Sequence, residues 1–342
     1  MGLRFALIGC GRIGQKHAEH MTAHGKVVAV CDTEKQHRDT LAEKYACSSY
    51  GSIEQLIASE KEIDLVAVCT PNGLHAVHSI ALLKAGFHVL CEKPMAIDVK
   101  DCEKMISAAN EAKKHLFIVK QNRFNPPIAE LKKVIDEGRL GKIFNVQLNC
   151  FWNRNEQYYA SSSWKGSQDL DGGTLFTQFS HFIDLLYWMI GDVKKVHVLT
   201  DNFLHKENID FEDTGVIVLK FANGALGTIN YTVNSFGKNM EGSITVFGEK
   251  GTVKVGGQYL NVLEYQNIEN YTMTAPIESK PANDYGYYQG SMSNHDKVYE
   301  NIAQVLAGNG QVATNGEEGL KTVEIIENIY NSVKQKIGLL NS

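Results

Sequence analysis

Near its N-terminus the chain reads Leu3-Arg4-Phe5-Ala6-Leu7-Ile8-Gly9-Cys10-Gly11-Arg12-Ile13-Gly14. Its first six residues are a mostly apolar run that predicts a strand, and the residues after Gly14 suit a helix. The three glycines between them form a GxGxxG motif: Gly9 permits a tight turn, Gly11 lets a pyrophosphate approach the backbone, and Gly14 lets helix and strand pack closely. The N–H groups at the helix N-terminus would then meet the phosphates. This order of strand, glycine loop and helix predicts a dinucleotide-binding Rossmann fold.

A second predicted strand, Val27-Val28-Ala29-Val30-Cys31, ends at Asp32. An acid at this point accepts hydrogen bonds from the adenosine ribose hydroxyls and repels a 2′-phosphate, so NAD is favoured over NADP. The competing interpretation is a simple glycine turn followed by an aspartate that caps a helix.

Strands and helices keep alternating as far as Val119, which predicts a doubly wound parallel sheet. Ligands bind beyond the carboxyl ends of such strands, and polar residues follow the buried runs Leu65–Cys69 and Phe87–Leu90 there. The predicted cofactor-binding residues are Gly9, Gly11, Arg12, Ile13, Gly14, Asp32, Thr70, Pro71, Asn72, His75, Glu92, Lys93 and Gln121.

A chain of 342 residues is too long for one ordinary core, so two domains are expected. Residues 1–122 are predicted to form an NAD-binding Rossmann domain, and residues 123–342 a substrate-binding and oligomerisation α/β domain. Strands separated by tight turns predict a large, mostly antiparallel open sheet in this second domain. Tyr265 to Ser291 is polar and is expected to be an extended loop, and the C-terminal helix could return to the first domain.

Bulk composition excludes several classes of partner. A formal net charge of −5 argues against a nucleic-acid surface, which needs clustered Lys and Arg. The seven cysteines are scattered without a CxxC pair, which indicates reduced thiols in the cytoplasm and neither a disulfide framework nor a metal site. No apolar run approaches the roughly 18 residues of a membrane span, and the N-terminus lacks the pattern of a signal peptide. The expected partner is a small molecule.

Lys93 is the first candidate catalytic residue. It belongs to the stretch Glu92-Lys93-Pro94, which follows a predicted strand and would deliver both charges to the rim of the parallel sheet. The alternative is a solvated charge pair at a strand end.

His181 is the second candidate. It lies on a strongly apolar predicted helix that follows Gly172-Gly173, within one turn of Thr177 and Gln178. A histidine can serve as general acid or base near neutral pH. A lone histidine on such a helix is, however, more often a satisfied core residue.

The glycine motif, the Glu92-Lys93-Pro94 stretch and the helix of His181 together resemble the Gfo/Idh/MocA family of sugar-type oxidoreductases, over nearly the whole chain. The resemblance implies a Rossmann domain followed by an α/β domain whose open sheet supports substrate binding and a homo-oligomer, a dimer or tetramer. In that family the lysine of the signature contacts the reacting sugar, often beside a cis Lys-Pro bond, and it maps onto Lys93. The family's catalytic histidine maps onto His181. Many members have an aspartate four residues before this histidine, where this chain has Thr177, so a mechanism that needs an Asp–His pair is in doubt.

Three further segments, Arg123–Pro127, Phe151–Gly166 and Ser293–Tyr299, resemble the WlbA-type dehydrogenases within the family. Those enzymes oxidise the 3-hydroxyl of UDP-N-acetylglucosaminuronic acid with NAD, ahead of an aminotransferase in polysaccharide biosynthesis. The basic residues of these segments would meet a pyrophosphate or uronate, with aromatic walls around it. The competing view is that the aromatics only roof the sheet. The predicted substrate-binding residues are Lys93, Arg123, Asn125, Arg154, Tyr158, Trp164, Lys165, Thr177, Gln178 and His181.

The sequence therefore predicts NAD-dependent oxidation of a sugar hydroxyl to a ketone. Either His181 deprotonates the hydroxyl while Lys93 holds the oxygen, or Lys93 is itself the base. A free polyol such as an inositol is the alternative substrate, for which the basic and aromatic segments would be incidental. A non-catalytic NAD-binding sensor or scaffold is the alternative from another class, and Thr177 is the feature that keeps it open.

Overall fold

The computed structural model describes residues 2–274, 282–286 and 288–340, with side chains as far as residue 333. Its contacts divide the chain into two compact units. Unit 1 consists of Met1–Val119 and His295–Val323, and unit 2 of Lys120–Asn294 and Glu324–Ser342. The last helix, α11 (Gly316–Leu340), therefore contributes residues to both. Among the described residues, none of the helices is both long enough and apolar enough to cross a membrane.

Unit 1 is built on a parallel sheet of six strands in the order β3-β2-β1-β4-β5-β6. The strands are β1 (Leu3–Ile8), β2 (Gly25–Cys31), β3 (Ser48–Tyr50), β4 (Leu65–Val68), β5 (His88–Cys91) and β6 (Leu116–Ile118). β1 lies in the middle and pairs with β2 on one side and β4 on the other. β4 is buried along its whole length, as expected for a strand covered on both faces. The predicted doubly wound parallel sheet is confirmed.

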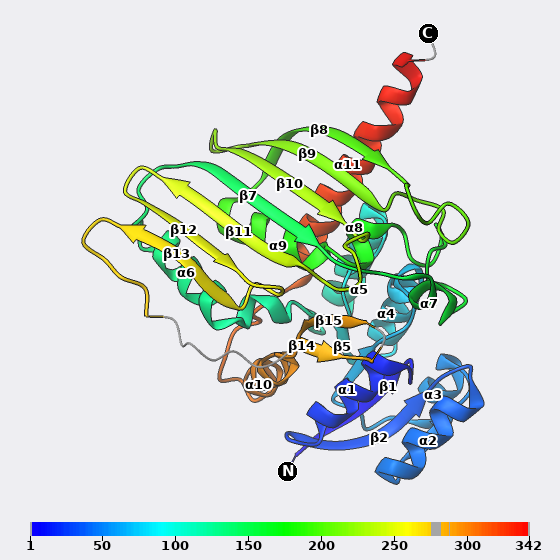
Figure 1. Ribbon diagram of the computed structural model, residues 1–342. Coiled ribbons are helices and arrows are strands. Elements are labelled where there is room, and N and C mark those ends of the chain that lie inside the picture. The colour runs from blue at the N-terminus through cyan, green and yellow to red at the C-terminus, as the bar shows by residue number, and fades with distance from the viewer. Residues whose placement is uncertain (1, 275–281, 287, 341–342) are drawn as a thin grey trace. The chain divides into compact units, whose positions relative to one another are not determined.

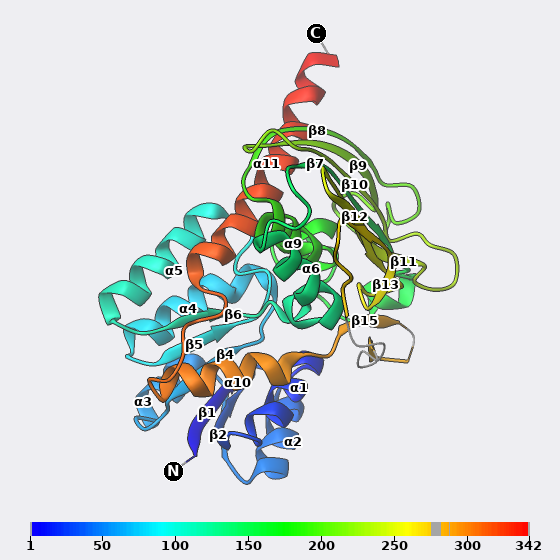
Figure 2. The same ribbon diagram turned by 90° about the vertical axis from the view of Figure 1, so that its left-hand side faces the viewer.

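The helices of unit 1 connect successive strands and cover both faces of this sheet, because crossovers between parallel strands are right-handed. They are α1 (Arg12–Met21), α2 (Lys35–Tyr45), α3 (Ile53–Ser59), η1 (Asn72–Leu74), α4 (His75–Lys84) and α5 (Val99–Ala112). A later segment, α10 (His295–Leu306), packs against α1 (Figure 2). Residues almost 300 positions apart in the sequence thus share one core.

Unit 2 contains a sheet of seven strands in the order β13-β12-β11-β7-β10-β9-β8 (Figure 1). They are β7 (Ile143–Phe151), β8 (Val193–Asp201), β9 (Thr214–Phe221), β10 (Leu226–Thr232), β11 (Glu241–Gly248), β12 (Gly251–Gly256) and β13 (Val262–Ile268). All neighbouring strands are antiparallel except β7 and β10, which pair in parallel. The predicted mostly antiparallel sheet is confirmed, and its central parallel pair is a new finding.

Helices precede and connect these strands in unit 2. They are η2 (Gln121–Phe124), α6 (Pro126–Asp136), α7 (Glu156–Ala160), α8 (Thr174–Thr177) and α9 (Ser180–Ile190). α9 contacts β7 and α6 contacts β12, and both views show these two helices on the same side of the sheet (Figures 1 and 2). Along β9 the burial alternates, so that Ile217 is fully buried whereas Val216 and Val218 are exposed.

The expectation of an extended loop from Tyr265 to Ser291 is wrong in part. β13 runs on to Ile268, and a small antiparallel pair is formed by β14 (Ala282–Asp284) and β15 (Gln289–Met292). The polar composition hid these strands, since such short edge pairs need few apolar residues. Residues 275–281 and 287 of this stretch lie outside the described residues.

Candidate functional site

The glycine loop of unit 1 has the close packing that a dinucleotide site requires. Gly9 has a φ of +91°, and a Cβ there would lie 2.5 Å from the carbonyl oxygen of Cys69. A Cβ on Gly14 would lie 2.0 Å from the carbonyl oxygen of Gly9. A Cβ on Gly11, in contrast, would meet nothing within 4 Å. Two glycines are therefore fixed by packing, and the middle one borders open space at the N-terminus of α1, where a pyrophosphate would fit.

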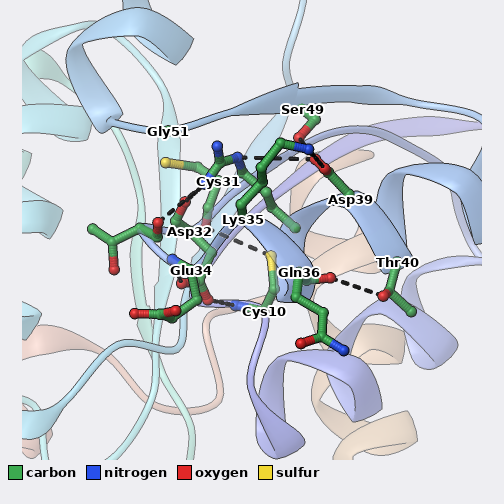
Figure 3. A network of polar contacts seen from close by, with 12 residues as sticks. Cys10, Cys31, Asp32, Glu34, Lys35, Gln36, Asp39, Thr40, Ser49 and Gly51 are labelled. Carbon is green, nitrogen blue, oxygen red and sulfur yellow. Dashed lines mark hydrogen bonds and ion pairs between the residues drawn. The ribbon is translucent and has the colours of Figure 1, made fainter.

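Asp32 follows β2 and its carboxylate is held against this loop (Figure 3). One oxygen accepts the N–H of Cys10 at 2.6 Å, and the other accepts the N–H of Glu34 at 2.8 Å. A carboxylate has about four lone-pair positions, so two such bonds leave capacity for the hydroxyls of a ribose. Asp32 is thus pre-positioned by the backbone for the role that the sequence predicts.

The remaining predicted cofactor residues of unit 1 follow β4 and β5. The ring nitrogens of His75 lie 2.7 Å from the carbonyl oxygen of Pro94 and 2.8 Å from that of Thr70, which ties the two strand ends together. Burial lowers the pKa of His75, and the hydrogen bonds to the two carbonyl oxygens offset this only in part. The peptide bond between Lys93 and Pro94 is cis, as the resemblance implies. Asn72 and Glu92 are buried.

Gln121, predicted as a cofactor residue, lies in unit 2 beside His181. His181 is buried in the first turn of α9, and its Nε2 lies 3.3 Å from the amide nitrogen of Gln121. The same amide nitrogen donates a hydrogen bond to the hydroxyl of Ser291 at 3.1 Å. The predicted catalytic histidine therefore contacts Gln121, which Ser291 holds in turn, and the sequence around His181 indicated neither contact.

Arg123 and Asn125, both predicted to bind substrate, have protein partners. Arg123 donates two hydrogen bonds of 2.8 Å to the carboxylate of Asp184 on α9, and Lys120 lies 3.3 Å from the same carboxylate. The side chain of Asn125 donates to the carbonyl oxygens of Tyr259 and Leu260. These bonds fasten η2 to α9 and to the sheet, and contact of either residue with a substrate stays a prediction.

Arg154 is the centre of a second polar cluster in unit 2. Its guanidinium is 2% exposed and donates to the side-chain oxygen of Gln178 at 2.6 Å. It also faces the rings of Trp152, Tyr158 and Tyr288, at 4.9, 5.2 and 5.2 Å from their centroids. Three residues predicted separately as substrate-binding, Arg154, Tyr158 and Gln178, are thereby brought into one place.

Lys165 belongs to the same cluster, because it also contacts the ring of Tyr158. Its ammonium lies 4.0 Å from the centroid of the Tyr158 ring, and the hydroxyl of Tyr158 accepts a hydrogen bond from Gln178 at 2.7 Å. Two cations therefore border one aromatic ring. Trp164 lies next to Lys165 in the turn that follows α7 and is partly exposed.

Thr177 has a carboxylate beside it in the folded chain. Its hydroxyl donates a hydrogen bond to the carboxylate of Asp171, which also accepts the N–H of Gly166 at 2.8 Å. The acid absent from position 177 is therefore supplied next to it from six residues earlier in the chain. Only the fold reveals this, because six residues is not a helical spacing.

A Rossmann unit with a closely packed glycine loop and an acid after its second strand, followed along the chain by a unit with a mostly antiparallel sheet and a buried histidine, is the arrangement expected of an NAD-dependent oxidoreductase. The chain belongs to the Gfo/Idh/MocA family: residues 3–120 match the oxidoreductase family NAD-binding Rossmann fold, and residues 132–339 match the oxidoreductase family C-terminal alpha/beta domain.

Two solved structures are similar over almost the whole chain. The WlbA dehydrogenase from Bordetella pertussis, in complex with NADH and UDP-GlcNAcA, is 34% identical with a TM-score of 0.87, covering 98% of this chain and 97% of that one. The WlbA dehydrogenase from Chromobacterium violaceum, with the same ligands, is 37% identical with a TM-score of 0.88, covering 98% and 94%. An inositol 2-dehydrogenase from Rhizobium meliloti is 26% identical over 98% of both chains.

These similarities confirm the expected family, the cofactor NAD and the class of enzyme. The protein is an NAD-dependent dehydrogenase of the sugar-type oxidoreductases. The alternative of a non-catalytic sensor, which rested on Thr177, is therefore not retained.

Proposed function

We propose that this dehydrogenase oxidises a hydroxyl of an acidic nucleotide sugar, of the UDP-N-acetylglucosaminuronic acid type, to a ketone. The observation that carries the proposal is the environment of Arg154. Its hydrogen-bond partners are the side chains of Gln178 and Asn239 and the backbone oxygen of Asn153, all of them neutral. In the described part of the chain no carboxylate forms an ion pair with it. Among the described residues, the positive charge of Arg154 therefore has no negative partner.

This arrangement is costly unless a ligand completes it. Burial lowers the pKa of Arg154, but an arginine keeps its proton near neutral pH. Burying such a charge without an opposite charge costs several kcal/mol, and a well-placed ion pair contributes a free energy of about the same size. A carboxylate or phosphate of the substrate would supply the missing charge, and the guanidinium plane matches either group with two parallel hydrogen bonds.

The position of Arg154 links this anion site to the predicted catalytic histidine. Its partner Gln178 precedes His181 by three residues, at the junction of α8 and α9. An anionic group held by Arg154 and Lys165 would thus bind beside the segment that carries His181. The two similar WlbA structures hold a uronic acid linked to UDP, which has acidic groups of both kinds.

The roles of the catalytic residues follow from their chemistry. NAD, when bound, accepts the hydride from the carbon that bears the hydroxyl. His181 takes the proton of this hydroxyl at a ring nitrogen, and the ammonium of Lys93 donates a hydrogen bond to the oxygen and stabilises its developing charge. Asp171 and Gln121 fix Thr177 and His181 in unit 2 without taking part in the transfer themselves.

The proposal is tested by NADH formation with UDP-N-acetylglucosaminuronic acid, neutral UDP-N-acetylglucosamine and myo-inositol, for the wild type and Arg154→Met. The wild type should prefer the acidic sugar, and Arg154→Met should lower its kcat/KM by about 30- to 1000-fold, which corresponds to about 2–4 kcal/mol. The neutral sugar should lose far less.

Arg139→Met is the matched control, because Arg139 lies on the surface of the same unit and pairs with Glu137. It should turn over the acidic sugar like the wild type. Equal kcat/KM values for acidic and neutral sugars in the wild type, or an unchanged preference in Arg154→Met, would reject the proposal.

The second candidate substrate is a free polyol, since the inositol dehydrogenase of Rhizobium meliloti matches 98% of the chain. A polyol carries no anion and leaves the charge of Arg154 unmatched. Preferred turnover of myo-inositol in the same assay would establish it.

A further inference from the structure

Three buried polar side chains from distant parts of the sequence meet beneath the end of β5 in unit 1. They are His17 of α1, Glu92 directly after β5, and His295 at the start of α10, with exposed fractions of 0, 5 and 1%. The Nε2 of His17 lies 2.8 Å from Oε1 of Glu92, and the Nε2 of His295 lies 3.4 Å from the same oxygen. Neither histidine is among the predicted cofactor-binding, substrate-binding or catalytic residues.

The protons of this cluster can be placed. Burial acts to raise the pKa of Glu92, but the hydrogen bond from His17 and the nearness of His295 outweigh it and hold the pKa well below its usual value. Burial lowers the pKa of His17, with only partial compensation by Glu92. A neutral His17 therefore donates Nε2–H to an ionised Glu92. Its Nδ1 accepts the hydroxyl hydrogen of Tyr299, 2.8 Å away, so that both ring nitrogens have partners.

The second oxygen of Glu92 connects the cluster to Lys93. This Oε2 accepts the backbone N–H of Lys93 at 2.9 Å. The carboxylate thus bridges His17 on one side and the peptide nitrogen of Lys93 on the other. A side chain that starts from a fixed peptide nitrogen is itself directed, so the orientation of Lys93 depends on where the carboxylate is held.

We propose that His17 and His295 are positioning residues that fix Lys93 through the carboxylate of Glu92. The inference rests on the proposed role of Lys93 at the reacting oxygen. This role explains the burial of His295 against the carboxylate of Glu92, although neither ring nitrogen of His295 has a hydrogen bond among the described residues. The contact prevents the side chain of Glu92 from rotating away. Burying His295 in this way is unfavourable, and the precise placement of Lys93 is what this cost achieves.

Two histidines and a carboxylate could also bind a transition metal, since their ligand atoms lie within 4.8 Å of one another. Two observations favour hydrogen bonds over a metal ion here. His17 and Glu92 lie at hydrogen-bond distance, and both nitrogens of the His17 ring have hydrogen-bond partners. Metal binding at this cluster would contradict the proposal.

The test is a double-mutant cycle on the sugar with the highest turnover. His17→Leu should lower kcat by about 10- to 100-fold, as expected for a misplaced catalytic group, whereas the Kd for NAD should change by no more than about threefold. His17→Gln, whose amide nitrogen can replace Nε2, should recover most of the loss. In a Lys93→Met background His17→Leu should cost almost nothing further, because the group that it positions is gone.

Two variants keep the test independent of folding defects. Tyr299→Phe preserves the ring that packs on Phe5 and removes only the hydroxyl that fixes His17, so it should lower kcat by a smaller factor and the melting temperature by only a few degrees. His88→Leu alters a histidine at the other end of β5, away from Lys93, and should turn over like the wild type.

The proposal is overturned if His17→Leu lowers kcat equally in both backgrounds, if His17→Gln recovers nothing, or if the purified wild type holds one equivalent of metal that His17→Leu loses. These results differ from failure of the proposed function, which would appear as unchanged turnover in Lys93→Met itself.

Discussion

Replacement of Asp184 by Asn should destabilise unit 2 strongly and in a pH-dependent way. Asp184 is buried on α9 and accepts two hydrogen bonds from Arg123, with Lys120 also within ion-pair distance. Burial acts to raise its pKa, but the charges of Lys120 and Arg123 outweigh it and lower the pKa to about 2. The variant removes the negative charge that both of these buried cations contact.

The magnitude follows from these contacts. The drop in pKa from 3.8 to about 2 corresponds to about 2.5 kcal/mol of stabilisation by the ionised form. Because the folded-state pKa lies below the unfolded value, this stabilisation is complete above about pH 4 and is lost as the pH falls through about 2. Removal of one partner from a buried ion pair costs about 3–5 kcal/mol, so Asp184→Asn should lose this amount at pH 7.

Tryptophan fluorescence during guanidinium unfolding is the assay, because the three tryptophans, Trp152, Trp164 and Trp188, all belong to unit 2. Trp188 also lies on α9 against Arg123, with the guanidinium carbon 5.0 Å from its ring centroid. The wild type should lose stability between pH 4 and pH 2, whereas Asp184→Asn should start lower and vary less in this range.

The matched control is Asp136→Asn, in which the exposed pair with Lys132 on α6 is removed. An exposed pair one helical turn apart contributes about 0.5 kcal/mol or less. A loss below about 1 kcal/mol in Asp184→Asn, or the same acid dependence in both proteins, would show that this network does not hold η2 on α9.

Two further substitutions test the support of α8. Glu212 is buried and accepts hydrogen bonds from the hydroxyls of Tyr231 and Tyr330, and burial raises its pKa from 4.5 to about 7. The folded state therefore binds the proton more tightly, and the free energy of unfolding should fall by up to about 3 kcal/mol as the pH rises from about 4.5 past 7. Glu212→Gln should remain flat over this range and exceed the wild type at pH 8 in urea unfolding; parallel profiles would contradict the assignment. Gly173 has a φ of +138°, and a Cβ there would lie 2.2 Å from the hydroxyl oxygen of Tyr330, so Gly173→Ala should cost more than about 2 kcal/mol. Gly224→Ala, with a φ of +93° and open space around its Cβ, should cost about 1 kcal/mol, and equal losses in melting experiments would refute the role of the clash.

The fold of unit 1 could be predicted because its signals are local. Buried apolar runs, a glycine loop and an acid after the second strand are all read within about 30 residues, and each has one structural explanation. β3 was missed because Ser48–Tyr50 is short and largely exposed. The parallel pairing of β7 with β10 was missed for a different reason: strand direction depends on the path of the whole intervening chain, which no short pattern records.

The candidate site was predictable in its residue types and less so in its contacts. Lys93 and His181 follow from motifs, and Arg154 from its aromatic neighbours in the sequence. The partners of Glu92 did not, because His17 and His295 are joined to it only by folding. Arg123 shows the converse limit, since a basic residue beside a site gives the same sequence signal whether it awaits a ligand or already binds Asp184.

The parallel pairing of β7 with β10 also bears on how the protein is made. Residues 152–225, which contain Arg154, Thr177 and His181, form the connection between these two central strands. Contacts between strands so distant in sequence close late and slowly during folding. A nascent chain therefore has to synthesise and arrange the segment that carries these three predicted site residues before the two central strands can pair. We expect the environment of His181 and the centre of the sheet in unit 2 to form together, so that a partly folded molecule has neither.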